Sequence, residues 1–315
     1  MQNFTQFIMH IRKLGQHFPA RLKRPLIKVW LLVERLDVKW QSRHAQINPK
    51  PIFVLGNQKA GTSAITALLA EMTASSASID LINENLYKHQ SYPRLRMGEV
   101  SFSKFLQINR LSFSRDIVKE ANLTIFYDEL VKHFPQSKFV FILRDPRDNI
   151  KSQLHIMGVP GHLPHLHAKH LKNLRNGWNT IIDGSWIGLT GGNYVEMLAA
   201  RWNFMTDMYL NHLDNMVLVR YEDFVKDKVG EITRLARILG LTQVNDITAK
   251  VDIQFQPKGN RDIGWTAFFG QDNLARIEHI CGDRMKRFHY PLHKNAEATV
   301  ISRIRTPLLK VLPTE

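Results

Sequence analysis

Short apolar runs alternate with longer segments of helical periodicity along most of this 315-residue chain. Three runs, Ile52–Leu55, Phe139–Leu143 and Val217–Arg220, are almost continuously apolar, as is typical of strands that are buried on both faces. This pattern predicts an α/β fold of the P-loop type, in which a central parallel sheet is flanked by helices on both faces. Helices are expected at Thr62–Met72, Asp128–Phe134, Tyr194–Leu213, Val229–Leu239 and Asp272–Phe288.

Three stretches between these elements are less regular. Residues 75–86 predict a short strand or loop near Ile82–Leu86. Residues 87–115 have weak periodicity and several basic side chains, which predicts a mobile region that faces the substrate. Residues 155–170 are rich in histidine, but no cysteine or carboxylate accompanies the histidines. A lid or a substrate-contacting loop is therefore favoured there over a metal site.

The N-terminal residues 1–48 predict a basic amphipathic helix, set apart from a main domain at 49–293 and a tail at 294–315. An apolar stripe of this kind packs on its own protein or, on a basic helix, binds an anionic membrane surface. The stripe at helical spacing consists of Leu26, Val29, Trp30, Val33, Leu36 and Trp40.

The segment Phe53–Leu69 combines a buried strand, a glycine-bounded loop and a helix that begins at two hydroxyl residues. Backbone N–H groups and the positive end of the helix dipole meet at such a loop, so it attracts phosphate. A Walker A loop requires lysine after its second glycine, but Thr62 stands there and the lysine, Lys59, lies inside the loop. This order of residues argues against a P-loop kinase or NTPase and favours a loop that binds a different phosphate donor.

A second candidate phosphate site follows the next apolar run. Arg144 ends the predicted strand, Asp145 can cap the next helix, and Pro146 fits its first position. Ser152 lies eight residues after Arg144 on that helix, so the two side chains can converge at the carboxyl edge of the sheet. The alternative is that Arg144 forms a structural ion pair with Asp145 or Asp148.

Together these segments resemble the sulfotransferases that use 3′-phosphoadenosine-5′-phosphosulfate (PAPS). Lys59–Ser63 resembles the 5′-phosphosulfate loop of that family, and Arg144 with Ser152 resembles its 3′-phosphate pair at the same spacing. The resemblance covers roughly residues 50–292 and is nearest to the tyrosyl-protein and bacterial glycan or small-molecule branch. Two later segments also match: Val217–Phe224 and Gly259–Trp265.

The resemblance implies that the chain moves a sulfuryl group from PAPS to a hydroxyl or amine and releases 3′-phosphoadenosine-5′-phosphate (PAP), with no metal. The acceptor would be a glycan, a lipid-linked molecule or a small molecule. Negative charge grows on the oxygen that leaves, so a fixed cation there stabilises the transition state, and Lys59 is the candidate. The alternative interpretation of Lys59 is a solvated loop lysine without a role in the reaction. The residues expected to bind the donor are Lys59, Ala60, Gly61, Thr62, Ser63, Arg144, Ser152, Lys258, Gly259 and Arg261.

The acceptor hydroxyl must lose a proton, and a carboxylate or histidine within hydrogen-bond distance would accept it. In the branch that the chain resembles, the base is a glutamate roughly 15–25 residues after the phosphosulfate loop, and Glu84 lies in that window. His89 and Glu99 are the alternatives. Lys119 lies where relatives have a lysine near the sulfuryl group, although the proline expected after it is missing.

The charge and the cysteine content bear on the ligands, the partners and the cellular compartment of the protein. The net charge of +15 points to anionic ligands, and residues 1–50 contribute ten Lys and Arg against two Asp and Glu. A nucleic-acid-binding protein is an alternative, but the chain has no recognisable recognition motif, so no nucleic-acid partner is expected. Cys281 is the only cysteine, which excludes an intrachain disulfide and favours a reducing compartment. Val29–Val33 is too short to span a bilayer. Golgi-type members of the family that the chain resembles usually begin with a membrane anchor, so the resemblance then implies a cytoplasmic, bacterial enzyme.

Overall fold

The computed structural model describes most of the chain, in two compact units formed by residues 1–46 and 47–315. Of the predicted N-terminal helix, residues 40–44 are helical and residues 45–48 are not, while residues 1–37 and 39 lie outside the described residues. The sheet and the candidate site belong to the second unit. The described residues are 38, 40–82, 91–172, 174, 177–253 and 263–292.

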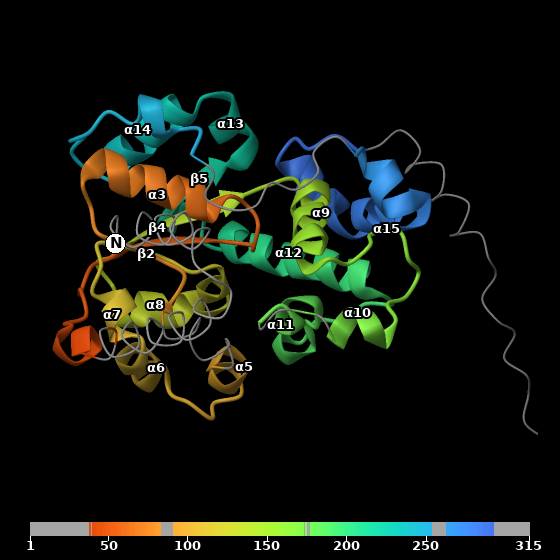
Figure 1. Ribbon diagram of the computed structural model, residues 1–315, viewed down its shortest axis with the longest axis horizontal. Helices are drawn as coiled ribbons and strands as arrows, with labels where there is room; N and C mark the ends of the chain where they lie inside the picture. Colours follow the sequence, from red (N-terminus) through yellow and green to blue (C-terminus); the bar gives the residue numbers. More distant parts are fainter. Residues whose placement is uncertain are drawn as a thin grey trace, which may run out of the picture. The chain divides into compact units, whose positions relative to one another are not determined.

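A five-stranded sheet in the order β2-β3-β1-β4-β5 forms the centre of the second unit (Figure 1). All neighbouring strands are parallel, and Phe53 of the central strand β1 lies opposite Val118 of β3 and Phe139 of β4. Every residue of β1 is buried, which explains its continuous apolar pattern. The strands are β1 Ile52–Gly56, β2 Ala77–Ile79, β3 Ile117–Lys119, β4 Lys138–Leu143 and β5 Met216–Arg220.

Helices cover both faces of the sheet, which confirms the predicted α/β fold. Figure 1 shows α3, α13 and α14 on one side of the sheet and α8 and α12 on the other. Side chains alternate along a strand, so Val54 enters the core beneath α3 and α14, while Phe53 enters the core shared with α9, α12 and α15. These helices are α3 Thr62–Thr73, α8 Tyr127–His133, α9 Pro146–Met157, α12 Tyr194–Leu210, α13 Tyr221–Lys226, α14 Lys228–Ile238 and α15 Trp265–Arg287.

The chain between β2 and β3, predicted to include a mobile region that faces the substrate, forms short helices where it is described. Its aromatic side chains are buried: the ring of Tyr92 lies 5.8 Å from Phe105, and Phe113 lies 6.2 Å from Phe53. No helix here reaches two full turns, so none displays a readable period. The helices are α5 Ser91–Arg96, α6 Phe102–Ile108 and α7 Arg110–Phe113.

Strands β2 and β3 were not predicted as strands, because each has three residues and too few positions to show a pattern. They nevertheless extend the sheet and carry Asp80 and Lys119 to its carboxyl edge, next to the loop that follows β1. The remaining short elements are η1 Ala121–Phe126, α10 Ala168–Lys172, α11 Asn179–Ile182, η2 Ser185–Ile187, η3 Leu213–Asn215 and η4 Thr248–Lys250.

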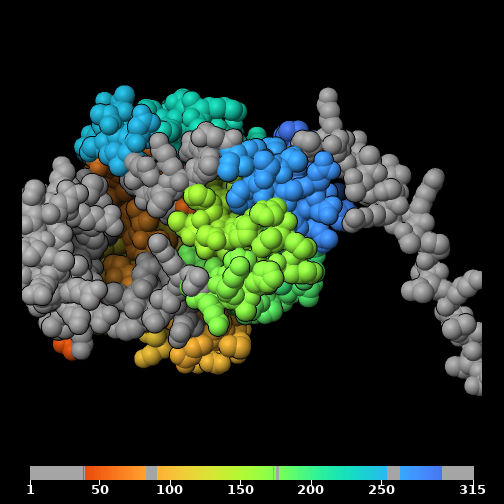
Figure 2. Space-filling model, turned by 45° about the vertical axis from the view of Figure 1, so that its right-hand side comes forward, coloured from red at the N-terminus to blue at the C-terminus, as the bar shows by residue number. Residues whose placement is uncertain are grey.

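The last helix, α15, begins at Trp265 rather than at the predicted Asp272 and is kinked at Gly270, where φ is +69°. Figure 2 shows the segment after α9 beside α15 on one face of the molecule. Asn273 joins them, because its Nδ2 donates to the carbonyl oxygens of Gly161 at 2.8 Å and Leu163 at 2.9 Å. Across the described residues, no helix combines the length and the apolar character that a membrane crossing requires.

Candidate active site

The loop that joins β1 to α3 adopts an uncommon backbone conformation. Lys59 has φ of +67° and Gly61 has φ of +103°, both in the left-handed region. Glycine enters this region freely, whereas a lysine does so at an energetic cost, and such strain persists where the surroundings enforce it. Gly61 is also restricted by space, because a Cβ there would lie 2.3 Å from Cδ2 of Tyr221.

The predicted phosphate cradle lies at the start of α3. Ala60, Thr62 and Ser63 are buried, and Gly61 occupies the N-cap position without a side-chain cap. The first N–H groups of a helix have no partner within the helix, so an uncapped N-terminus at the carboxyl edge of a parallel sheet suits an anion. The four residues are thus placed together, as the sequence predicts.

Lys59, Lys119 and Arg144 form a group of cations at this edge. Burial, together with the positive charges of Arg144 and Lys119, lowers the pKa of Lys59 to about 8, and the nearby Asp80 partly offsets this shift. The ammonium of Lys119 is buried and forms an ion pair with Asp80, which itself has φ of +63°. Three mutually repelling cations with one carboxylate among them leave a net positive charge, which makes this edge a candidate site for a multiply charged anion.

Arg144 contacts the loop directly. Its Nη1 donates to the carbonyl oxygen of Lys59 at 3.0 Å, and its guanidinium carbon lies 4.5 Å from the centre of the Tyr221 ring. Its Nε is buried, and no hydrogen-bond partner for it exists among the described residues. A buried donor without a partner is uncommon, and an anion at this edge would satisfy it.

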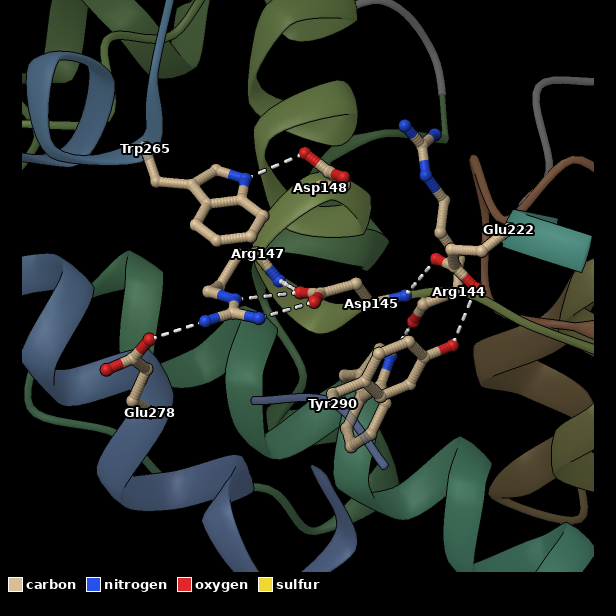
Figure 3. Close-up of polar contacts among 9 residues, drawn as sticks. Arg144, Asp145, Arg147, Asp148, Glu222, Trp265, Glu278 and Tyr290 are labelled. Atoms are coloured by element: carbon tan, nitrogen blue, oxygen red, sulfur yellow. Dashed lines mark hydrogen bonds and ion pairs between the residues drawn. The ribbon is translucent and has the colours of Figure 1, made fainter. Parts of the chain in front are cut away.

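The alternative interpretation of Arg144, an ion pair with Asp145 or Asp148, does not apply in the described residues. Asp145 binds Arg147 instead, with Nη2 to Oδ2 at 2.6 Å and Nε to Oδ1 at 3.0 Å. Asp148 accepts a hydrogen bond from the indole nitrogen of Trp265 at 2.8 Å. Figure 3 shows the side chain of Arg144 directed away from the ion pair of Asp145 and Arg147.

Arg147 links the start of α9 to α15. Its Nη1 donates to Glu278 at 2.7 Å, and its guanidinium lies 3.8 Å from the centre of the Trp265 ring (Figure 3). Burial alone would lower the pKa of Arg147, but the hydrogen bonds and charges of Asp145 and Glu278 raise it above its ordinary value. Trp265 therefore packs on a buried arginine.

The backbone at Arg144 is fixed from two further sides. Nε1 of Trp202 donates to the carbonyl oxygen of Arg144 at 2.9 Å, and the N–H of Asp145 donates to Glu222 at 2.9 Å. Glu222 also accepts from the hydroxyl of Tyr290 at 2.8 Å (Figure 3). The segment after β5 thus supports Arg144 through Glu222 and packs against Gly61 through Tyr221.

The other predicted site residues are only partly described. Ser152 lies on α9, one helical turn beyond Asp148, and is partly exposed. Glu99, an alternative for the base, forms an exposed ion pair with Arg94 at 3.1 Å. Within the described ranges no group of three His, Cys, Asp and Glu could hold a metal ion. The predicted residues outside these ranges are Glu84, His89, Lys258, Gly259 and Arg261.

A network of buried amides behind the loop was missed by the sequence analysis. The carbonyl oxygen of Gln58 accepts from Nδ2 of Asn149 and Nε2 of Gln153, both at 2.9 Å. Its side-chain Nε2 donates to Asn122 at 2.7 Å, and its Oε1 accepts two longer bonds from the fully buried Arg201. Polar residues on the inner faces of α9 and α12 were the available signal, because such positions are otherwise apolar.

The chain is similar in structure to several solved sulfotransferases. Sulfotransferase STF9 from Mycobacterium avium is 12% identical with a TM-score of 0.52, over 82% of each chain. Mouse sulfotransferase SULT7A1, in a complex with PAP, is 15% identical with a TM-score of 0.45, over 84% of this chain and 92% of that one. The sulfotransferase from Alicyclobacillus acidocaldarius is 15% identical with a TM-score of 0.40, over 74% and 96%.

At these identities the similarity concerns the fold alone, and no curated protein matches the sequence. The sequence itself carries the stronger signal. A family model described as the sulfotransferase domain matches residues 49–262, which is more than half of the chain and includes both candidate phosphate segments. The chain belongs to the sulfotransferase family.

Proposed function

We propose that this protein transfers a sulfuryl group from PAPS to a hydroxyl or amine acceptor and releases PAP. One observation carries the proposal: Lys59, Lys119 and Arg144 share one edge of the sheet, where burial and mutual repulsion lower the pKa of Lys59 to about 8. A donor with phosphates at both its 3′ and 5′ positions would relieve that repulsion. The buried, unpartnered Nε of Arg144, judged among the described residues, supports the same donor.

The residues of the loop have separate tasks in this proposal. The backbone of Ala60–Ser63 and the N-terminus of α3 would hold the 5′-phosphate, while Arg144 and Ser152 would hold the 3′-phosphate. PAPS would supply the sulfuryl group. Lys59 would stabilise the charge that develops on the leaving oxygen, which is the position where a fixed cation lowers the barrier most. Lys119, held by Asp80, would present a second cation next to Lys59.

The acceptor side of the proposal is broader. We infer a hydroxyl-bearing or amine-bearing glycan, lipid-linked molecule or small molecule, with Glu84 as the proton acceptor. The single cysteine, Cys281, is buried and supports a cytoplasmic location. A contact between residues 1–48 and an anionic membrane belongs to the same proposal and is supported only by the basic amphipathic pattern of that segment.

Calorimetric titration tests the donor assignment without an acceptor. PAP, ATP with magnesium, and AMP are titrated into the full-length chain and into the Arg144→Ala variant. We expect metal-independent binding of PAP with micromolar or better affinity, weaker binding of AMP, and a loss of at least tenfold in PAP affinity in the variant, since a charge-assisted bond to phosphate contributes about 1.5–3 kcal/mol. Equal binding of ATP and PAP, or an unchanged variant, would contradict the proposal.

A further inference from the structure

Gln58, the residue before Lys59, is held on four sides by side chains from three separate elements. Asn149 and Gln153 on α9 bind its carbonyl oxygen, Asn122 on η1 accepts from its side-chain nitrogen, and Arg201 on α12 donates to its side-chain oxygen. Asn149 also accepts from Asn57 at 2.9 Å. The strained φ of Lys59 thus follows directly after the most extensively bound residue of the loop.

Arg201 is the unusual member of this group. It is fully buried, its Nη1 has no hydrogen-bond partner among the described residues, and no ion pair joins it to a carboxylate there. Its bonds to Gln58 are long, at 3.4 Å from both Nε and Nη2, and a shorter bond of 3.0 Å runs from Nη2 to Asn122. Burial lowers the pKa of Arg201 to about 9, although Glu120 partly offsets this shift.

The other fully buried arginine, Arg147, provides the contrast. It has two carboxylate partners and an aromatic ring over its guanidinium, so its charge is compensated. Arg201 has amide oxygens as its hydrogen-bond acceptors, and its charge is offset only in part, by the buried carboxylate of Glu120. A buried cation with so little compensation costs folding free energy.

We propose that Arg201 is a positioning residue for Lys59: by fixing the side chain of Gln58, it keeps the β1–α3 loop in the left-handed conformation that places Lys59 beside Lys119 and Arg144. This inference rests on the proposed function, because it concerns the loop that would bind PAPS. It also explains the role of α9, which supports Gln58 through Asn149 and Gln153 and begins directly after Arg144. The two predicted phosphate sites therefore share one buried support.

The test separates positioning from stability. Arg201→Met, Gln58→Met, the double variant and Arg147→Met are compared by urea unfolding and by calorimetric titration with PAP at pH 8.5 in two buffers of different ionisation enthalpy. Methionine fills the space without a charge. Arg201→Met removes a buried cation but leaves the buried Glu120 without its nearby charge, whereas Arg147→Met breaks two direct ion pairs, with Asp145 and Glu278. We therefore expect a clearly smaller fall in urea midpoint for Arg201→Met than for Arg147→Met.

The titrations report on Lys59 itself, which is surrounded by Arg144 from β4, Lys119 from β3 and Asp80 from the end of β2. With a pKa of about 8, a substantial fraction of the wild-type lysine is neutral at pH 8.5, so PAP binding should take up protons. In Arg201→Met the loop relaxes, the lysine regains solvent and its ordinary pKa, and the uptake should fall towards zero. PAP affinity should fall roughly tenfold, as expected for the loss of hydrogen bonds that hold a charged site.

Because Arg201 acts through Gln58, the double variant should lose no more PAP affinity than the more affected single variant. Gln58→Met provides the same readout if Arg201→Met does not fold. Additive losses, unchanged proton uptake in both single variants, or a fall in urea midpoint for Arg201→Met equal to that for Arg147→Met would each overturn the positioning role. Absence of PAP binding to the wild type would instead overturn the proposed function, and this inference with it.

Discussion

Gly61 is the position where the structure makes the sharpest quantitative prediction. A Cβ at Gly61 would lie 2.3 Å from Cδ2 and 2.6 Å from Cε2 of Tyr221, and φ of +103° is unfavourable for any other residue. Gly61→Ala therefore combines backbone strain of about 1–2 kcal/mol with displacement of a ring from a packed position, at about 1–3 kcal/mol. Moving the ring also weakens its contact with Arg144, which is worth about 0.5–1 kcal/mol.

We expect Gly61→Ala to lower the free energy of unfolding by roughly 3–5 kcal/mol in urea titrations and to abolish measurable PAP binding. Gly98→Ala is the matched control, because Gly98 has φ of +77° but no atom within 4 Å of its would-be Cβ. Strain alone should make the control about 1–2 kcal/mol less stable. Equal losses in the two variants, or normal PAP affinity in Gly61→Ala, would refute the close packing of Tyr221 on the loop.

Three further predictions concern charge and hydrogen bonding around the site. Since a bound anion raises the lowered pKa of Lys59, PAP affinity should be highest below pH 8 and fall by up to tenfold per pH unit above it. Calorimetry from pH 6.5 to 9.5 measures this profile, and a flat profile would exclude the cationic role of Lys59. Asp80→Asn removes a carboxylate that repels phosphate, so PAP affinity at pH 6.5 and low salt should rise roughly threefold to tenfold. Weaker binding of PAP to this variant would mean that Asp80 mainly orients Lys119. Trp265→Phe keeps an aromatic ring but loses the bond to Asp148, so urea unfolding should show a loss of about 1 kcal/mol, and an unchanged midpoint would mean that this bond adds nothing to stability.

The sequence predicted the strands and helix starts of the two candidate phosphate segments well, because each is locally encoded. The strand before Lys59 and the strand before Arg144 are buried on both faces, and the cap at Asp145 with Pro146 after it marks the start of α9, as observed. Their convergence at one edge follows from the parallel sheet alone. Family resemblance then supplied the donor, because phosphate-binding geometry does not distinguish PAPS from other nucleotides.

What the sequence could not predict depends on partners far apart in the chain. Arg201 lies 143 residues after Gln58, and nothing in its own helix identifies an amide on another element as its partner. The helices between β2 and β3 were missed for a different reason. Segments as short as Arg110–Phe113 are stabilised by burial of residues such as Phe113 and not by their own periodicity.

The strand order also sets the spacing between the two candidate phosphate segments. Lys59 follows β1 and Arg144 follows β4, and these strands are hydrogen-bonded neighbours in register, so about 4.8 Å of backbone spacing separates the points from which the two loops depart. That spacing is set by peptide hydrogen bonds, which side-chain substitution leaves intact. The region between β2 and β3 contains short helices and turns, which take no part in the pairing of β1 with β4. Substitutions in that region therefore leave the starting points of the Lys59 and Arg144 loops in place.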